Sequence, residues 1–104
     1  MADSFSSPGM LPDTFTEDEV REPRKFKVLL HNDDYTTMDF VVHVLTFVFR
    51  KTLAQATEIM LKIHNQGVGV CGVYTAEVAE TKVVRVHQLA REAGYPLKCT
   101  MEEV

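Results

Sequence analysis

Four polar residues could act together if the fold brings them close. Asn32, Asp33 and Asp34 are consecutive and follow an apolar run, and His64 comes later, near the predicted end of a helix. Carboxylate oxygens, an amide oxygen and the bare nitrogen of a neutral imidazole all accept hydrogen bonds. A primary ammonium group has one positive charge and three donors, so such a set of acceptors could bind it.

The apolar residues near these four suggest what the amine would be attached to. Met38, Val41, Met60 and Ile63 lie close to them in sequence. A pocket with an acidic mouth and an apolar floor would accept a free amine joined to a hydrophobic side chain, as at the N-terminus of a protein. The methionines could equally be core residues that fill irregular space.

Structural interpretations of the same residues stay open. Asn and Asp are common in turns because their side chains bond nearby backbone, so Asn32-Asp33-Asp34 could only connect a strand to a helix. His64 could serve only the end of a helix, where a positive charge is favourable.

Two kinds of chemistry fit the residue types but not their spacing. His31, Asp33, Asp34 and His64 are possible metal ligands, yet they match no metal-binding motif. The Asp33–Asp34 pair could perform acid–base catalysis, but no Ser or Cys nucleophile lies beside a base. We therefore expect no metal, no cofactor and no catalytic residue, and keep a metal-dependent hydrolase as the less favoured alternative.

The first predicted elements flank the polar triplet. Residues 26–31 alternate between apolar and mixed positions, which predicts a strand with one buried face. Thr36 as N-cap with Asp39 at N3 matches a capping box and predicts a helix that runs to about Arg50.

The later elements are predicted in the same way. Thr52 and Gln55 form a second capping box, and Gly67 is placed to end that helix. Residues 68–74 contain closely spaced glycines and predict a strand with a bulge or a close backbone approach. Thr75 begins a third helix that Gly94 and Pro96 end, and residues 97–102 alternate as a last strand.

This order of elements predicts an α+β fold. We expect a two-layer sandwich with the order β-α-α-β-α-β, in which three helices pack on one face of a three-stranded sheet. Residues 26–104 would form this core domain. Residues 1–25 are polar, without a regular apolar pattern, and are expected to be a disordered N-terminal extension.

Composition excludes several classes of protein. The 104 residues suffice for one domain, and a net charge of -4 gives no basic surface for nucleic acid. Cys71 and Cys99 lie in apolar runs and are expected to be core thiols. No secretory signal or membrane-spanning stretch is evident, so we expect a cytoplasmic protein. No pattern indicates a dimer interface, and we expect a monomer.

Four blocks of sequence resemble one family. NDDYTTMDFV, IMLKIHNQG, CGVYTAEVAETKV and AGYPLKCTMEE occur in the order found in ClpS proteins, and the resemblance covers about residues 26–104. ClpS proteins are bacterial adaptors that deliver N-degron substrates to the ClpA unfoldase of the ClpAP protease. The resemblance therefore implies a binding protein for chains that begin with Leu, Phe, Tyr or Trp, which also modulates the substrate choice of ClpA. A module that regulates the unfoldase without carrying cargo is the alternative.

The resemblance also assigns roles to individual residues. Asn32, Asp33, Asp34 and His64 match the residues that hold the α-amino group. Met38 matches a gate residue that disfavours β-branched first residues. A further set matches the pocket for the first side chain: Thr36, Met38, Val41, Val42, Met60, Ile63 and Leu97. Two more residues match the contact with the N-terminal domain of ClpA, namely Glu77 and Lys82. Thr37 departs from the family, because many members have proline before the gate methionine.

Overall fold

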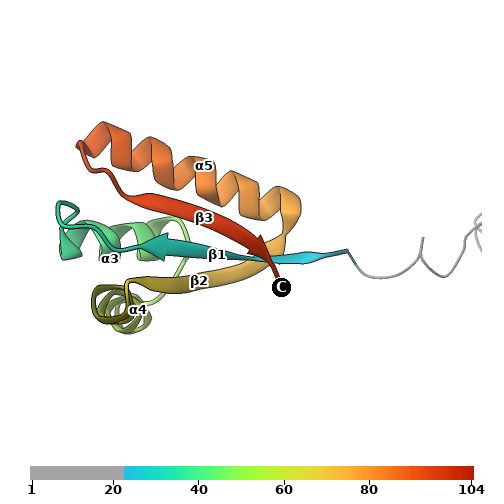
Figure 1. The fold of residues 1–104 in the computed structure, drawn as a ribbon, viewed down its shortest axis with the longest axis horizontal. Coiled ribbons are helices and arrows are strands. Elements are labelled where there is room, and N and C mark those ends of the chain that lie inside the picture. Colours follow the sequence, from blue (N-terminus) through green and yellow to red (C-terminus); the bar gives the residue numbers. More distant parts are fainter. Residues whose placement is uncertain (1–22) are drawn as a thin grey trace, which may run out of the picture.

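The structure, a computed structural model, describes residues 23–104 (Figure 1). Its elements follow one another in the predicted order β-α-α-β-α-β. They are β1 (Lys25–His31), α3 (Met38–Phe47), α4 (Leu53–Gln66), β2 (Val68–Thr75), α5 (Ala76–Ala93) and β3 (Lys98–Glu103). The extension predicted for residues 1–25 lies outside the described residues except for its last three, and of these Lys25 already belongs to β1.

The sheet has β1 in the centre, with β2 and β3 antiparallel on either side. Val28 and Leu30 are fully buried on one face of β1, beside Cys71 of β2 and Cys99 of β3. The side chains of β1 that alternate with them are only half-buried. The helices therefore cover one face of the sheet, and α5 extends along β3 in Figure 1. This arrangement confirms the predicted α+β fold.

The glycine-rich strand β2 carries the irregularity that its sequence predicts. Val28 pairs with Gly72, whereas the next residue, Leu29, pairs with Val70. Cys71 is thus an extra residue on β2, and the strand has a bulge there.

Three helix ends also agree with their sequence signals. The Thr52 side chain accepts from the Gln55 amide, and the Gln55 side chain accepts from the Thr52 amide, which completes the predicted capping box. Gly67 and Gly94 end α4 and α5 with positive φ angles of 90° and 82°. Only glycine adopts this conformation without a steric cost.

The limits predicted for α3 were wrong at both ends. Its N-cap is Thr37 rather than Thr36, because the amide and hydroxyl of Thr36 are both bonded to Asp33. The helix ends at Phe47 rather than near Arg50, which has a left-handed φ of 58°. Arg50 lacks the usual sequence signal for that conformation, since most residues that adopt it are Gly or Asn.

Candidate functional site

Asp33 organises the loop between β1 and α3. Its Oδ1 atom accepts from the amides of Tyr35 and Thr36 at 2.8 and 2.7 Å, and its Oδ2 atom accepts from the Thr36 hydroxyl at 2.7 Å. Burial alone would raise the pKa of Asp33, but these hydrogen bonds outweigh it and the pKa is lowered. The carboxylate is therefore held in its charged form and in one orientation.

The neighbouring carboxylate is in a different environment. Asp34 is exposed, and its carboxylate has no hydrogen-bond or ion-pair partner within residues 23–104. Sequence alone treats Asp33 and Asp34 as an equivalent pair. The Asp-x-x-Thr spacing from Asp33 to Thr36 is the signal that could have separated them, because it is typical of a side-chain-bonded turn.

A backbone hydrogen bond joins this loop to the end of α4. The amide of Asn32 donates to the carbonyl oxygen of Gly67 at 2.8 Å. Gly67 follows the last turn of α4, and His64 lies in that turn. The polar triplet and His64, which are far apart in sequence, are therefore brought to one end of the molecule.

Gly69 allows α4 to pack closely on β2 beside the same site. A Cβ atom at Gly69 would lie 2.7 Å from Cγ1 of Ile63, which is closer than such atoms approach in proteins. Any larger residue would force the Ile63 side chain, which lines the site, to move. The glycine-rich pattern predicted a close approach, but not that it supports this site.

A cavity of about 210 Å³ lies where these elements meet. All the residues around it are among those that the resemblance assigns to amine or side-chain binding. They are Asn32, Asp33, Asp34, Thr36, Met38, Val41, Met60, Ile63 and His64. Two further predicted residues are not part of this lining: Leu97 is buried in the core, and Val42 packs against it half-buried. Their role in side-chain binding stays a prediction.

The cavity combines hydrogen-bond acceptors with an apolar wall. Oδ2 of Asp33 accepts one hydrogen bond from Thr36 and retains capacity for a second. The apolar wall comes from α3 and α4 and includes the buried residues Val41 and Ile63. Such a site can bind a cationic donor group attached to an apolar group.

The geometry does not favour the metal site considered above. Within residues 23–104, no group of three or more His, Cys, Asp or Glu side chains is arranged to hold a metal ion. The Nε2 atom of His31 is 2.7 Å from the hydroxyl of Thr100 on β3. His31 is therefore engaged across the sheet and does not line the cavity.

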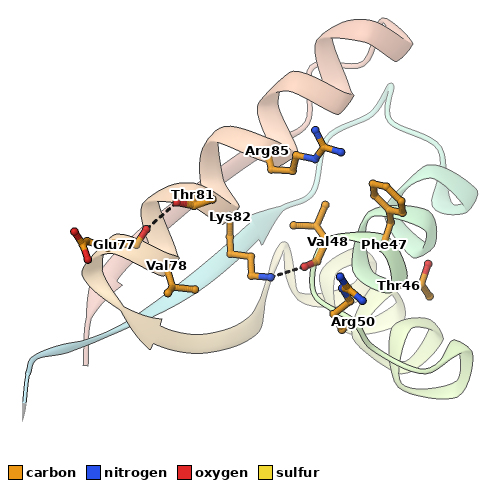
Figure 2. Close-up of a pocket in the computed structure, with 9 residues that line it drawn as sticks. All are labelled: Thr46, Phe47, Val48, Arg50, Glu77, Val78, Thr81, Lys82 and Arg85. Carbon is orange, nitrogen blue, oxygen red and sulfur yellow. Dashed lines mark hydrogen bonds between the residues drawn. The ribbon is translucent and has the colours of Figure 1, made fainter.

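A second, larger hollow of about 650 Å³ lies between the end of α3 and α5 (Figure 2). It contains Glu77 and Lys82, the two residues that the resemblance assigns to contact with the unfoldase. The residues around it are Thr46, Phe47, Val48, Arg50, Glu77, Val78, Thr81, Lys82 and Arg85, and we call it the α3–α5 groove.

Lys82 also has a structural contact in the α3–α5 groove. Its Nζ atom donates to the carbonyl oxygen of Val48, at the end of α3, at 2.7 Å (Figure 2). It also lies 5.6 Å from the centroid of the Tyr74 ring. Glu77 is exposed in the first turn of α5 and is free of such constraints. Substitution of Lys82 would therefore disturb the fold as well as the groove.

The sequence is similar to those of known adaptor proteins. A family model described as "ATP-dependent Clp protease adaptor protein ClpS" matches residues 21–100. An ATP-dependent Clp protease adapter protein ClpS of Nitratidesulfovibrio vulgaris strain Miyazaki F is 72% identical over 88 residues, which are 85% of this chain and 88% of that protein. Another, from strain DP4, is 61% identical over 104 residues and the full length of both proteins.

A solved structure has the same fold. Agrobacterium tumefaciens ClpS2 bound to L-phenylalaninamide superposes with a TM-score of 0.77 and is 40% identical. The match covers 80% of this chain and 100% of the other. None of the helices described for residues 23–104 could span a membrane. The chain belongs to the ClpS family of adaptor proteins of the ATP-dependent Clp protease.

Proposed function

We propose that this adaptor binds N-degrons and delivers them to the ClpA unfoldase for degradation by ClpAP. It recognises the free α-amino group together with a large hydrophobic first residue, namely Leu, Phe, Tyr or Trp. It performs no chemistry itself and acts as a monomer in the cytoplasm. The observation that carries the proposal is one cavity that contains both the acceptors and the apolar wall.

The ammonium group is held by charge and by matched hydrogen bonds. Asp33 provides a fixed carboxylate, and the exposed Asp34 adds a second negative charge at the mouth of the cavity. Asn32 and His64 accept hydrogen bonds from the remaining N–H groups of the ammonium. Hydrogen bonds that involve a charged group are about twice as strong as neutral ones, so most of the amine selectivity comes from the carboxylates.

The first side chain enters the apolar part of the cavity. Val41, Met60 and Ile63 form its wall, and the partly exposed Met38 stands at its entrance as the gate. A β-branched first residue is wide next to its Cα atom and would meet Met38, whereas Leu and Phe are wide only further along. The Agrobacterium ClpS2 complex with L-phenylalaninamide supports this assignment, since that ligand has a free amine beside an aromatic side chain.

The α3–α5 groove is proposed as the contact with the N-terminal domain of ClpA. Glu77 presents a charge at its rim, and apolar groups of Phe47 and Val78 are about half exposed beside it. Exposed apolar side chains within a polar rim are typical of protein–protein contacts.

Fluorescence anisotropy with a labelled peptide that begins with Phe tests the amine proposal. The control is the same peptide with an acetylated N-terminus, which has lost the charge and two donors but keeps the side chain. Binding of the free peptide alone is the expected result. Equal binding of both would indicate a plain apolar groove, and binding of neither would favour the regulator that carries no cargo.

The unfoldase contact is tested with Glu77→Lys and a matched control, Glu92→Lys. Both residues are exposed on α5, and the helical rise of 1.5 Å per residue separates them by about 22 Å. Only Glu77→Lys should weaken binding to the isolated N-terminal domain of ClpA, while peptide affinity stays unchanged in both. Equal effects of the two variants would place the contact elsewhere.

A further inference from the structure

The hydroxyl of Thr37 connects the start of α3 to another part of the chain. Its Oγ1 atom accepts from the amide of Phe40 at 3.2 Å, as an N-cap should, and donates to the Tyr95 hydroxyl at 3.4 Å. A hydroxyl group has one donor and two acceptor sites, so it can make both bonds together. Thr37 is therefore tied to its own helix and to the segment between α5 and β3.

Tyr95 is a firm anchor for this contact. The amide of Gly94 donates to the Arg91 carbonyl at 3.2 Å, and the amide of Tyr95 donates to the Ala90 carbonyl at 2.8 Å. With Gly94 at a φ of 82°, these two bonds form a Schellman motif at the end of α5. Pro96 follows and restricts the backbone of Tyr95 further.

Aromatic packing supports the same connection. The rings of Phe40 and Tyr95 have centroids 4.8 Å apart and are tilted by 44°. Tyr95 thus contacts the first turn of α3 twice, through its ring at Phe40 and through its hydroxyl at Thr37. The first turn of α3 is held through these contacts by the segment between α5 and β3, independently of the Asp33 loop.

Met38 is the residue whose position depends most on this connection. It directly follows Thr37, is the first residue of α3 and lines the cavity. Its side chain is 44% exposed, so packing alone constrains it little. We propose that Thr37 and Tyr95 are positioning residues for the Met38 gate, and that their hydrogen bond contributes to the rejection of β-branched first residues.

This inference rests on the proposed function and explains how a gate can work without the proline found in many family members. Thr37 has a φ of −73°, which is within the range that the ring of proline would impose. The side-chain contacts of Thr37 take the place of the missing ring. The contact with Tyr95 reaches solvent, so water competes for it and its effect on selectivity is moderate.

The test compares dissociation constants for peptides that differ only in a first residue of Leu or Ile. Tyr95→Phe removes the hydroxyl but keeps the ring contact and the N-cap, and Thr37→Val removes both bonds of Thr37. We expect Tyr95→Phe to reduce the Ile-to-Leu ratio of dissociation constants by about two- to tenfold, the size of one hydrogen bond, and Thr37→Val to reduce it at least as much. Thr37→Ser keeps the hydroxyl and should retain the wild-type ratio.

Further measurements separate positioning from general loss of structure. Addition of Tyr95→Phe to Thr37→Val should change the ratio no further, because both remove the same bond. Thermal unfolding confirms that each variant is folded. A wild-type ratio in Tyr95→Phe, with wild-type protein still selective for Leu, overturns the inference and leaves the proposed function intact. Wild-type protein that binds neither peptide overturns both.

Discussion

The two adjacent carboxylates should differ in their effect on amine binding. Asp33 is fixed by three hydrogen bonds within its loop, whereas Asp34 is exposed. Asp33→Asn keeps an oxygen that can accept from the amides of Tyr35 and Thr36, and it removes the charge. Asp33→Ala removes the charge and the turn, and Asp34→Asn removes only the exposed charge.

The expected losses follow from these environments. A hydrogen bond to a charged group contributes on the order of 1.5–3 kcal/mol, so Asp33→Asn should weaken peptide binding roughly ten- to hundredfold. Asp33→Ala should weaken it at least as much and also lower the melting temperature. An exposed charge pair contributes about 0.2–1 kcal/mol, so Asp34→Asn should cost no more than about fivefold.

Anisotropy titrations of a Phe-starting peptide measure all three variants, with the N-acetylated peptide as the baseline. High salt should reduce the loss of peptide affinity caused by Asp34→Asn more than the loss caused by Asp33→Asn, because exposed charges are screened more strongly. The assignment to Asp33 would be refuted if Asp33→Asn bound the free peptide as tightly as wild type does. A larger loss from Asp34→Asn would show that the exposed carboxylate is the main amine ligand.

Four other predictions follow from the same site and core. Because the pKa of Asp33 is lowered, its charged form stabilises the fold at pH values above the usual carboxyl range, and this contribution is lost as pH falls through the lowered pKa. In denaturant titrations, the difference in unfolding free energy between wild type and Asp33→Asn should therefore shrink below about pH 4. A difference that stayed constant with pH would contradict this prediction. His64→Ala should weaken peptide binding by about two- to tenfold because it removes one hydrogen-bond acceptor, and unchanged affinity in that variant would argue against His64 as an acceptor. Met38→Ala should admit peptides that begin with Ile or Val, and unchanged selectivity would argue against a gate there. Burial raises the pKa of both thiols, that of Cys99 to about 12. Alkylation of Cys71 and Cys99 at pH 8 should therefore be slow until denaturant is added. Rapid alkylation of the folded protein would contradict this prediction.

Regular elements of this fold could be predicted because their signals are local. Alternation of apolar residues identified β1, and the glycines at 67 and 94 marked the ends of α4 and α5. The end of α3 carried no such signal, since the left-handed residue there is Arg50. That conformation of Arg50 depends on tertiary packing, so it cannot be predicted from the spacing of residues in the sequence.

The start of α3 shows how a competing contact defeats a local pattern. Thr36 and Thr37 both have a residue three positions ahead whose amide they could cap. Asp33 binds the amide and hydroxyl of Thr36, which leaves Thr37 to cap the helix. The Asp39 carboxylate is also one methylene shorter than the Glu of a capping box.

The candidate site was predictable as a set of residue types but not as a geometry. Chemistry and resemblance both selected Asn32, Asp33, Asp34 and His64, and the cavity brings them together. The sequence does not predict the hydrogen bond from the Asn32 amide to the Gly67 carbonyl, which joins the polar triplet to the end of α4 beside His64. Because a carboxylate bonded within its own turn cannot reorient, Asp33 can only accept a donor that arrives along one direction. A peptide amine whose side chain lay against Val41 and Ile63 could approach in that way. We therefore expect the loop and the apolar wall together to favour an amine at the start of a chain over a lysine side chain.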